Sequence, residues 1–278
     1  MEEFASDRRG QNVISLYSPG AEDKAWRQHY LLQFLEDHLP EFAGPVATTV
    51  PVKEIMKAVR DAARRIYKLP KDPNSRGEIG ELLLHSLLSS CIGTNLLVSK
   101  IFFEDSPNDV PKGYDAVFID ADNNSVNTIW LGESKSYTDF GKAVTDALES
   151  VTKGLHSDYM NDEFMLISPK IPPRWKNNQE LEKMLDGTMS LDDVRKKIKI
   201  PVLIGYQDQK ILQHCMTNDE LRSHSEEHFV TKKTSIDNRD YVKIHDSFHF
   251  FLVPYPDKAS IVKAFDERIN ELKSERYR

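Results

Sequence analysis

The chain has 278 residues, of which 39% are hydrophobic, and a formal net charge of −7. This length fits one large α/β domain or a domain with an N-terminal annex, and no run of about 18 apolar residues is present to span a membrane. The two cysteines, Cys91 and Cys215, lie far apart and argue against a disulfide framework or a cysteine zinc site. The first 20 residues lack the basic start and apolar stretch of a signal peptide, so we expect a cytoplasmic protein.

The N-terminal part is interpreted as an extension, residues 1–50, in front of a main domain, residues 51–278. Within the extension we predict a helix from Glu22 to His38, which ends before Pro40. No residue pattern in this extension indicates a catalytic or binding role. Docking of a partner protein is the role that we expect for it.

A second helix is predicted from Val52 to Tyr67, and basic residues recur along it and just beyond it at steps of three and four. Such steps keep side chains on one face of a helix. The residues are Lys57, Arg60, Arg64 and Lys68. Two readings stay open: a solvated helix surface, which is the usual fate of a charged stripe, or a face that contacts nucleic acid or a partner.

The rest of the chain alternates between helical and strand patterns. Expected helices cover residues 78–91, 139–155, 179–197 and 257–273, and expected strands cover residues 95–103, 114–120, 129–135, 163–168, 201–206 and 241–255. Two of these strands are short, nearly continuous apolar runs, as in a parallel sheet buried on both faces. The alternation favours an α/β fold with a central mixed sheet flanked by helices.

Two of the predicted strands, separated by the turn-forming residues "DNNS", form a hairpin whose buried face ends in charged residues. Side chains two residues apart share one face of a strand. Pairing Val117 with Leu131 gives an apolar face and places Asp115 opposite Glu133, with Lys135 next on the same face. The question is what stabilises these charges beside each other.

A divalent cation answers this question. Opposed residues of an antiparallel pair have Cβ atoms about 4.5–5.5 Å apart, so the carboxylates of Asp115 and Glu133 would repel each other. Mg²⁺, or Mn²⁺ in its place, takes oxygen ligands and often binds through one or two carboxylates plus phosphate oxygens. Lys135 then lies where its charge orients an attacking water or steadies a phosphate in its transition state. The rival reading is a structural ion cluster at a sheet edge.

At these residues the sequence resembles the PD-(D/E)XK nuclease superfamily, with Asp115 as its aspartate and "ESK", Glu133 to Lys135, as its acid-x-Lys. The resemblance implies a restriction-endonuclease-like core and a further acid from the preceding helix. We assign that acid to Glu81, which follows Gly77 at the spacing often seen there, with Glu78 as the alternative. The superfamily's proline before the aspartate is absent, since Tyr114 stands there.

A closer resemblance, over about residues 50 to 275, is to the HamA-type nuclease subunit of the Hachiman anti-phage system. It lies in "RGEIGELLLHSLL", "GYDAVFID" and "LGESKSYTDFGKAVTDALES". This resemblance implies a bacterial, cytoplasmic defence nuclease that cleaves DNA with Mg²⁺ and works with a HamB-type helicase. A partner that engages DNA would also account for the negative net charge, which is otherwise unusual for a nucleic-acid-binding protein.

Two other functional classes were weighed. The first is a PD-(D/E)XK fold that only binds protein; such degenerate members usually lose the lysine or an acid, and both are present here. The second is a zinc peptidase, because "HSEEH" matches the H-x-x-E-H pattern and places His224 and His228 four residues apart. The flanking residues show no clear apolar stripe, so we expect an exposed polar segment there instead.

Overall fold

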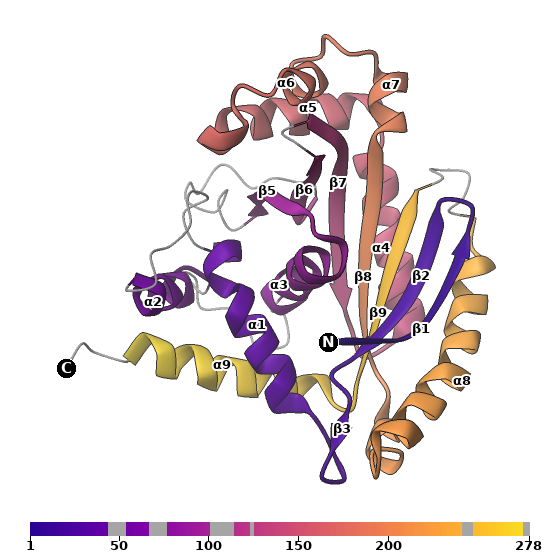
Figure 1. The fold of residues 1–278 in the computed structure, drawn as a ribbon. Helices are drawn as coiled ribbons and strands as arrows, with labels where there is room; N and C mark the ends of the chain where they lie inside the picture. Colours follow the sequence, from indigo (N-terminus) through magenta and orange to yellow (C-terminus); the bar gives the residue numbers. More distant parts are fainter. Residues whose placement is uncertain (44–53, 67–76, 101–113, 123–124, 241–246, 275–278) are drawn as a thin grey trace.

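The chain folds into an α/β protein with a central seven-stranded mixed sheet flanked by helices, as predicted from the sequence (Figure 1). The computed structural model describes residues 1–43, 54–66, 77–100, 114–122, 125–240 and 247–274. No helix in these ranges is both long enough and apolar enough to cross a membrane.

The sheet has the strand order β1-β2-β9-β8-β7-β6-β5. Its four central strands, β2, β9, β8 and β7, run parallel to one another, while β1, β6 and β5 pair antiparallel with their neighbours. The bounds are β1 Glu2–Arg9, β2 Asn12–Ser18, β5 Asn95–Ser99, β6 Ala116–Asp122, β7 Ser125–Ser136, β8 Ile198–Gln207 and β9 Phe248–Tyr255; a separate small ribbon is formed by β3 Ala21–Glu22 and β4 Ala25–Trp26.

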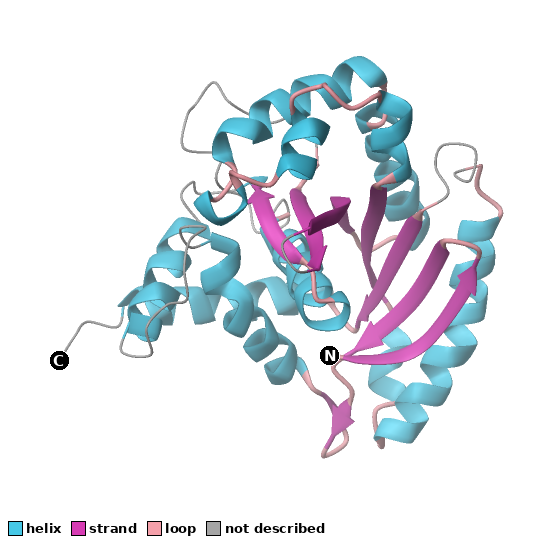
Figure 2. Ribbon diagram, turned by 45° about the horizontal axis from the view of Figure 1, so that its top comes forward, coloured by secondary structure: helices cyan, strands magenta, loops and turns pink. Residues whose placement is uncertain are grey.

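Helices cover both faces and one end of this sheet (Figures 1 and 2). Their bounds are α1 Gln28–Ala43, α2 Ile55–Ile66, α3 Glu78–Leu87, α4 Phe140–Gly154, α5 Ser157–Ile167, α6 Gln179–Leu185, α7 Leu191–Lys196, α8 Asn218–Asp237 and α9 Lys258–Ser274. A π-helical turn, Leu88–Ile92, continues α3, and Gly93 ends it with a left-handed backbone, φ +80°.

The two faces of β7 are covered by different helices. Ser134 lies against Gly80 of α3, whereas the neighbouring Glu133 interacts with Ser150 of α4. Because successive side chains of a strand point to opposite faces, α3 and α4 lie on opposite sides of the sheet. Helix α8 lies beside α4, where Arg239, just past the end of α8, donates one hydrogen bond to the Thr145 hydroxyl and one to the Gly141 carbonyl.

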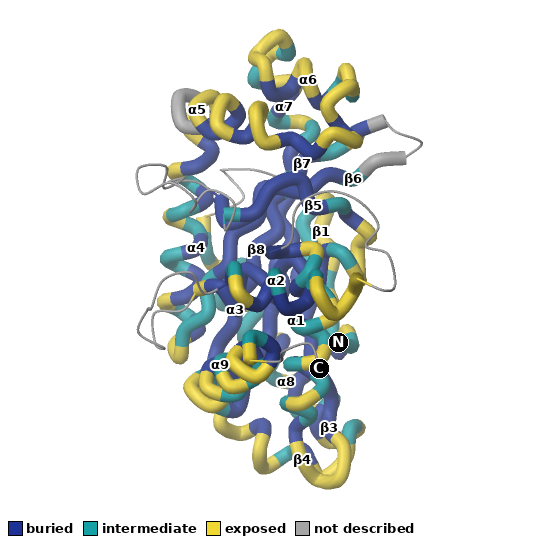
Figure 3. Tube along the Cα trace, turned by 90° about the vertical axis from the view of Figure 1, so that its left-hand side faces the viewer, coloured by how far each residue is buried: buried dark blue, intermediate teal, exposed yellow. Residues whose placement is uncertain are grey.

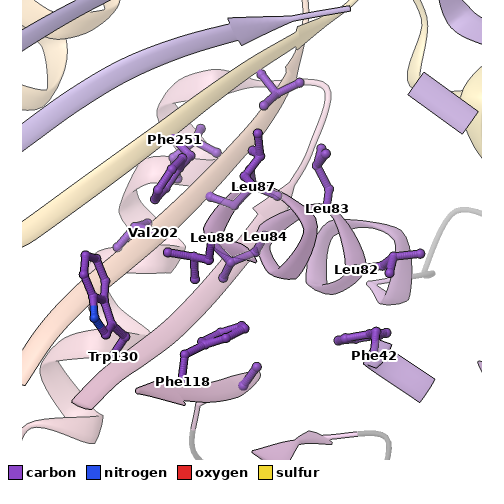
Figure 4. Close-up of a cluster of buried hydrophobic side chains, with 14 of the residues drawn as sticks. Phe42, Leu82, Leu83, Leu84, Leu87, Leu88, Phe118, Trp130, Val202 and Phe251 are labelled. Carbon is purple, nitrogen blue, oxygen red and sulfur yellow. The ribbon is translucent and has the colours of Figure 1, made fainter. Parts of the chain in front are cut away.

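The core is formed where the leucines of α3 meet the sheet (Figure 4). Leu82, Leu83, Leu84 and Leu87 are fully buried, and so is Phe118 of β6. Figure 3 shows the same arrangement along the described residues: the strands in the middle of the sheet are buried, and many exposed residues lie on the outer helices. All ten residues of α3 are buried, so this helix belongs to the interior.

The N-terminal residues differ most from their prediction. The helix expected from Glu22 to His38 is α1, which begins six residues later and contains Pro40. The residues before it form β1 and β2, which make one edge of the main sheet through pairing of β2 with β9. Residues 1–43 of the predicted extension, 1–50, therefore share the sheet and hydrophobic core of the main domain. Their expected role in docking a partner stays a prediction.

The strand expected at residues 163–168 is wrong, because this segment lies mostly in α5. Its apolar run is helical: Met160, Phe164 and Ile167 are buried on one face, while Met165 and Leu166 are exposed. Steps of four and three residues fit a helix as well as a continuous run fits a strand. The next strand after α4 is consequently β8. The single helix expected over 179–197 is divided into α6 and α7.

Candidate active site

The predicted hairpin is present with the predicted register. Val117 of β6 pairs with Leu131 of β7, and Ala116 pairs with Gly132. One step further, the Asp115 N–H donates a hydrogen bond to the Gly132 carbonyl at 2.9 Å. Asp115 therefore lies beside Gly132, the neighbour of Glu133, directly before β6 begins.

The Asp115 carboxylate is buried and fixed by three hydrogen bonds. Its Oδ2 accepts from the backbone N–H of Ser134 at 2.8 Å and from the Ser134 hydroxyl at 3.0 Å. Its Oδ1 accepts from the Lys100 ammonium at 3.3 Å. The Asp115 carboxylate thus accepts the Ser134 backbone N–H, as a carbonyl of a neighbouring strand otherwise would. These contacts hold the side chain in one orientation at the open end of the hairpin.

Glu133 is also buried, and its carboxylate accepts a hydrogen bond from the Lys135 ammonium on the same strand. Burial raises the pKa of Glu133 from its ordinary 4.5 to about 7, and the negative charge of Asp115 acts in the same direction. The attraction of Lys135 opposes both effects without cancelling them. This is the repulsion between two neighbouring carboxylates that the sequence predicts.

Lys100 completes the cluster and was missed by the sequence analysis. It follows β5, and its backbone N–H donates to the Asp115 carbonyl at 2.9 Å. Although burial lowers the pKa of its ammonium, the charges of Asp115, Glu81 and Glu133 outweigh burial and raise it well above the ordinary value. Lys100 also acts on the buried Glu163 of α5. Lys100 comes close to Asp115 through the pairing of β5 with β6. No local sequence pattern around Lys100 indicates this contact.

The two helical acids are both buried in the first turn of α3. Glu81 reaches the cluster through its interaction with Lys100, and Glu78 lies one turn earlier on the same helix. No three of the four acids, Asp115, Glu133, Glu81 and Glu78, bring ligand oxygens within 4.8 Å of one another. The Asp115–Glu133 pair is thus the part that fits Mg²⁺, which often binds through one or two carboxylates.

Two local features set the position of the site. Gly132 lets α3 approach the hairpin, since a Cβ there would lie 3.0 Å from Leu84 Cδ2 and 3.1 Å from the Ala116 carbonyl oxygen. Beyond Lys135, α4 starts immediately, because the Asp139 side chain accepts a hydrogen bond from the Lys142 N–H and caps it.

The predicted basic stripe on α2 is only partly at the surface. Lys57 and Arg64 are exposed, but Arg60 is buried at 7% exposure, and Lys68 lies outside the described residues. Arg64 is also paired with Asp61 at 3.0 Å. The prediction that these side chains form one solvent-facing row is wrong at Arg60, because α2 packs between α1 and α9 and turns this position inward.

The "HSEEH" segment lies in α8, so the expectation of an exposed polar segment is wrong for part of it. Leu221, Ser225 and Phe229 are buried where the helix lies against the N-terminal strands. His224 and His228 face Asp208, which directly follows β8. The third candidate metal ligand beside the two histidines, Asp208, therefore precedes them in the sequence. The zinc peptidase pattern would need its third ligand in a helix that follows the histidines.

Taken together, the open end of the hairpin and the residue after β5 present two buried carboxylates and two ammonium groups in one cluster. Such a set can hold a hard cation through its oxygens and stabilise negative charge through its lysines. This combination suits hydrolysis of a phosphate ester better than acyl transfer, because the cluster contains no serine, cysteine or histidine nucleophile–base pair among its described residues.

Comparison with known proteins gives one match. A family model described as HamA matches residues 2–269, nearly the full chain. No curated protein and no solved structure matches.

Proposed function

The chain belongs to the HamA family of the Hachiman anti-phage defence system, and we propose that it is the nuclease of that system, a Mg²⁺-dependent enzyme that hydrolyses DNA phosphodiesters. Membership gives the role in defence. The reaction, the ion and the substrate are inferred from the residues at the open end of the β6–β7 hairpin.

The observation that carries the proposal is the burial of two carboxylates, Asp115 and Glu133, in one cluster with two lysines. Keeping two carboxylates close together and buried destabilises a fold, which favours a ligand that needs them. A structural ion cluster, in which Lys100 pairs with Asp115 and Lys135 with Glu133, is the rival reading, and the cleavage test separates the two.

Each residue then has a distinct role. Asp115 and Glu133 would hold Mg²⁺, which when bound polarises the scissile phosphate and lowers the pKa of a water nucleophile. Lys135 positions that water or neutralises the charge that develops on phosphate. Lys100 would fix the Asp115 carboxylate, and Glu81, or Glu78 in its place, would contribute to holding the ion directly or through water.

The order of elements supports a PD-(D/E)XK core. Helix α3, strand β5, the β6–β7 hairpin, helix α4 and strand β8 follow each other in the order that this superfamily uses. The expected strand after α4 is provided by β8, with α5, α6 and α7 inserted before it. The charged residues lie at the positions of the superfamily's aspartate and acid-x-Lys, Asp115, Glu133 and Lys135.

A helicase partner of the HamB type, inferred from family membership, would supply much of the grip on DNA. The chain has a net charge of −7, and one of the four residues of the predicted basic stripe, Arg60, is buried. Both facts favour a nuclease that is delivered to DNA over one that binds DNA strongly by itself.

The test uses the full chain, alone and with its helicase partner, on linear DNA in Mg²⁺, Mn²⁺ or EDTA. Glu133→Gln and Lys135→Met should each lower cleavage at least about 100-fold, the scale at which removing a transition-state contact acts. Lys263→Ala, at an exposed position of α9, is the matched control and should cleave normally.

Two results would reject the proposal. Cleavage by both site variants at the control's rate would mean that the cluster is structural. Absence of cleavage by the wild-type complex in every metal would favour the rival class, a PD-(D/E)XK fold used only to bind its partner. Cleavage of RNA instead of DNA would keep the site and change the substrate.

A further inference from the structure

A second cluster lies away from the hairpin, where β8 meets α8. Asp208 directly follows β8, and two histidines one turn apart on α8 face its side chain. His224 Nε2 lies 2.9 Å from Asp208 Oδ2, and His228 Nε2 lies 3.8 Å from the same oxygen. One ligand atom from each residue lies within 4.8 Å of the other two.

The three side chains are held in place by other contacts. Asp208 Oδ1 accepts a hydrogen bond from the Lys210 N–H at 3.1 Å, which leaves Oδ2 toward the histidines. The His214 ring stacks on His224 with centroids 4.4 Å apart and planes within 7°. The His228 ring stacks on Tyr206 at 5.7 Å. The donors are thus oriented by the fold before any ligand arrives.

Hydrogen bonds among these three side chains do not satisfy all of their polar atoms. His224 satisfies Asp208 Oδ2, and His228 Nε2 is then shielded from solvent with no hydrogen-bond partner among the described residues. A buried polar atom without a partner destabilises a fold, and a bound ion would remove this cost.

We propose that Asp208, His224 and His228 form a binding site for a divalent transition metal, with Zn²⁺ as the favoured ion. Two imidazole nitrogens and one carboxylate are a common zinc ligand set, and imidazole suits zinc and its neighbours far better than Mg²⁺. The ion would bridge the end of β8 to α8 and satisfy all three donors together.

The site opens on one side to solvent. A surface hollow of about 780 Å³ is lined by the three ligands and by Lys210, Gln213 and other polar residues. Three protein ligands leave a fourth position of a tetrahedral ion for water or a small ligand. Bridging two segments far apart in sequence also means that the ion should stabilise the fold by binding only its native state.

This site is independent of the proposed nuclease centre. Its ligands come from β8 and α8, while the nuclease residues come from β6, β7 and α3. Its nitrogen donors select a different class of ion from the carboxylates of Asp115 and Glu133. Failure of either proposal therefore leaves the other unaffected.

The experiment titrates Co²⁺, a spectroscopic substitute for Zn²⁺, into the tag-free, chelator-treated full chain. With excess Mg²⁺ present to fill the carboxylate site of the hairpin, we expect one tightly bound Co²⁺ per chain, the visible absorption of a low-coordinate Co²⁺ site, and displacement by Zn²⁺ but not by more Mg²⁺. Zn²⁺ should also raise the thermal unfolding midpoint.

The variants His224→Ala and His228→Ala should weaken Co²⁺ binding at least about 100-fold, more than the about 10- to 100-fold typical of an outer-shell partner. His29→Ala, at an exposed position, should bind as wild type does. If a histidine variant does not fold, Asp208→Asn is the substitute, because its amide oxygen can still accept the Lys210 N–H. This variant should also weaken Co²⁺ binding, since it removes a carboxylate ligand. No Co²⁺ absorption, or unchanged affinity in the ligand variants, would overturn the proposal.

Discussion

Replacing Glu133 by glutamine tests the electrostatics of the hairpin directly, because the change removes a charge and keeps the size of the side chain. Glu133 has a pKa of about 7, compared with an ordinary value of 4.5. At about 1.36 kcal/mol per pH unit, this difference corresponds to about 3 kcal/mol of instability when the buried carboxylate is ionised. This figure already includes the attraction of Lys135, and burial of the polar glutamine amide offsets part of the gain.

The net expectation is that Glu133→Gln raises the free energy of unfolding by about 1–3 kcal/mol at pH 8 in EDTA. The sign follows from linkage: the pKa is higher in the folded protein, so wild-type stability is fully present below pH 4.5 and falls as pH rises to about 7. The advantage of the variant should therefore shrink toward pH 5.

Urea unfolding followed by tryptophan fluorescence at pH 5 and pH 8 measures both quantities, with Glu267→Gln on the exposed face of α9 as the control. A variant that is less stable than wild type at pH 8 would show that Lys135 already neutralises Glu133. A stability difference that is equal at the two pH values would show that the carboxylates do not repel. Either result would refute the argument for a cation between them.

Three further changes test other parts of the structure. Lys100→Met should lower cleavage by more than tenfold with the fold retained, checked by circular dichroism, because Asp115 loses the ammonium that holds its Oδ1. Gly132→Ala should lower unfolding stability by about 1–3 kcal/mol in urea, since the new methyl group would lie 3.0 Å from Leu84. His249→Phe should reduce acid sensitivity: burial lowers the His249 pKa to about 4, so wild-type stability falls as pH drops from about 6.5 to 4, and equal loss in both proteins would contradict this reading.

The hairpin could be predicted from the sequence because its information is local. Each strand carries a short apolar stretch, and turn-forming residues lie between the two strands. Counting outward from that turn pairs Val117 with Leu131, as the structure has it. The same count brings Asp115 to the end of the hairpin that carries Glu133 and Lys135, without any knowledge of the rest of the fold.

The missed features depend on contacts between distant segments. Lys100 lies beside Asp115 only because β5 pairs with β6 in a particular register. Strand β1 carries many charged residues, as expected of a sheet edge, and so gives no apolar alternation to detect. In α5, an apolar run that fits either a strand or a helix is decided by which side chains the neighbouring helices cover.

The same reasoning explains why the hairpin cluster could be predicted from the sequence and the cluster of Asp208, His224 and His228 could not. The acid-x-Lys of Glu133 and Lys135 is contained in three residues of one strand, whereas the zinc ligands combine a residue after β8 with two on α8. Yet the fold places both at related positions, near the carboxyl ends of the adjacent parallel strands β7 and β8, which is where α/β sheets gather their ligands. The Gln207 N–H donates to the Thr138 carbonyl just beyond these strands, so the two segments leave the sheet together. Separate donor chemistry, oxygen on β7 and nitrogen beside β8, is then what allows two metals to occupy neighbouring strand ends without competing.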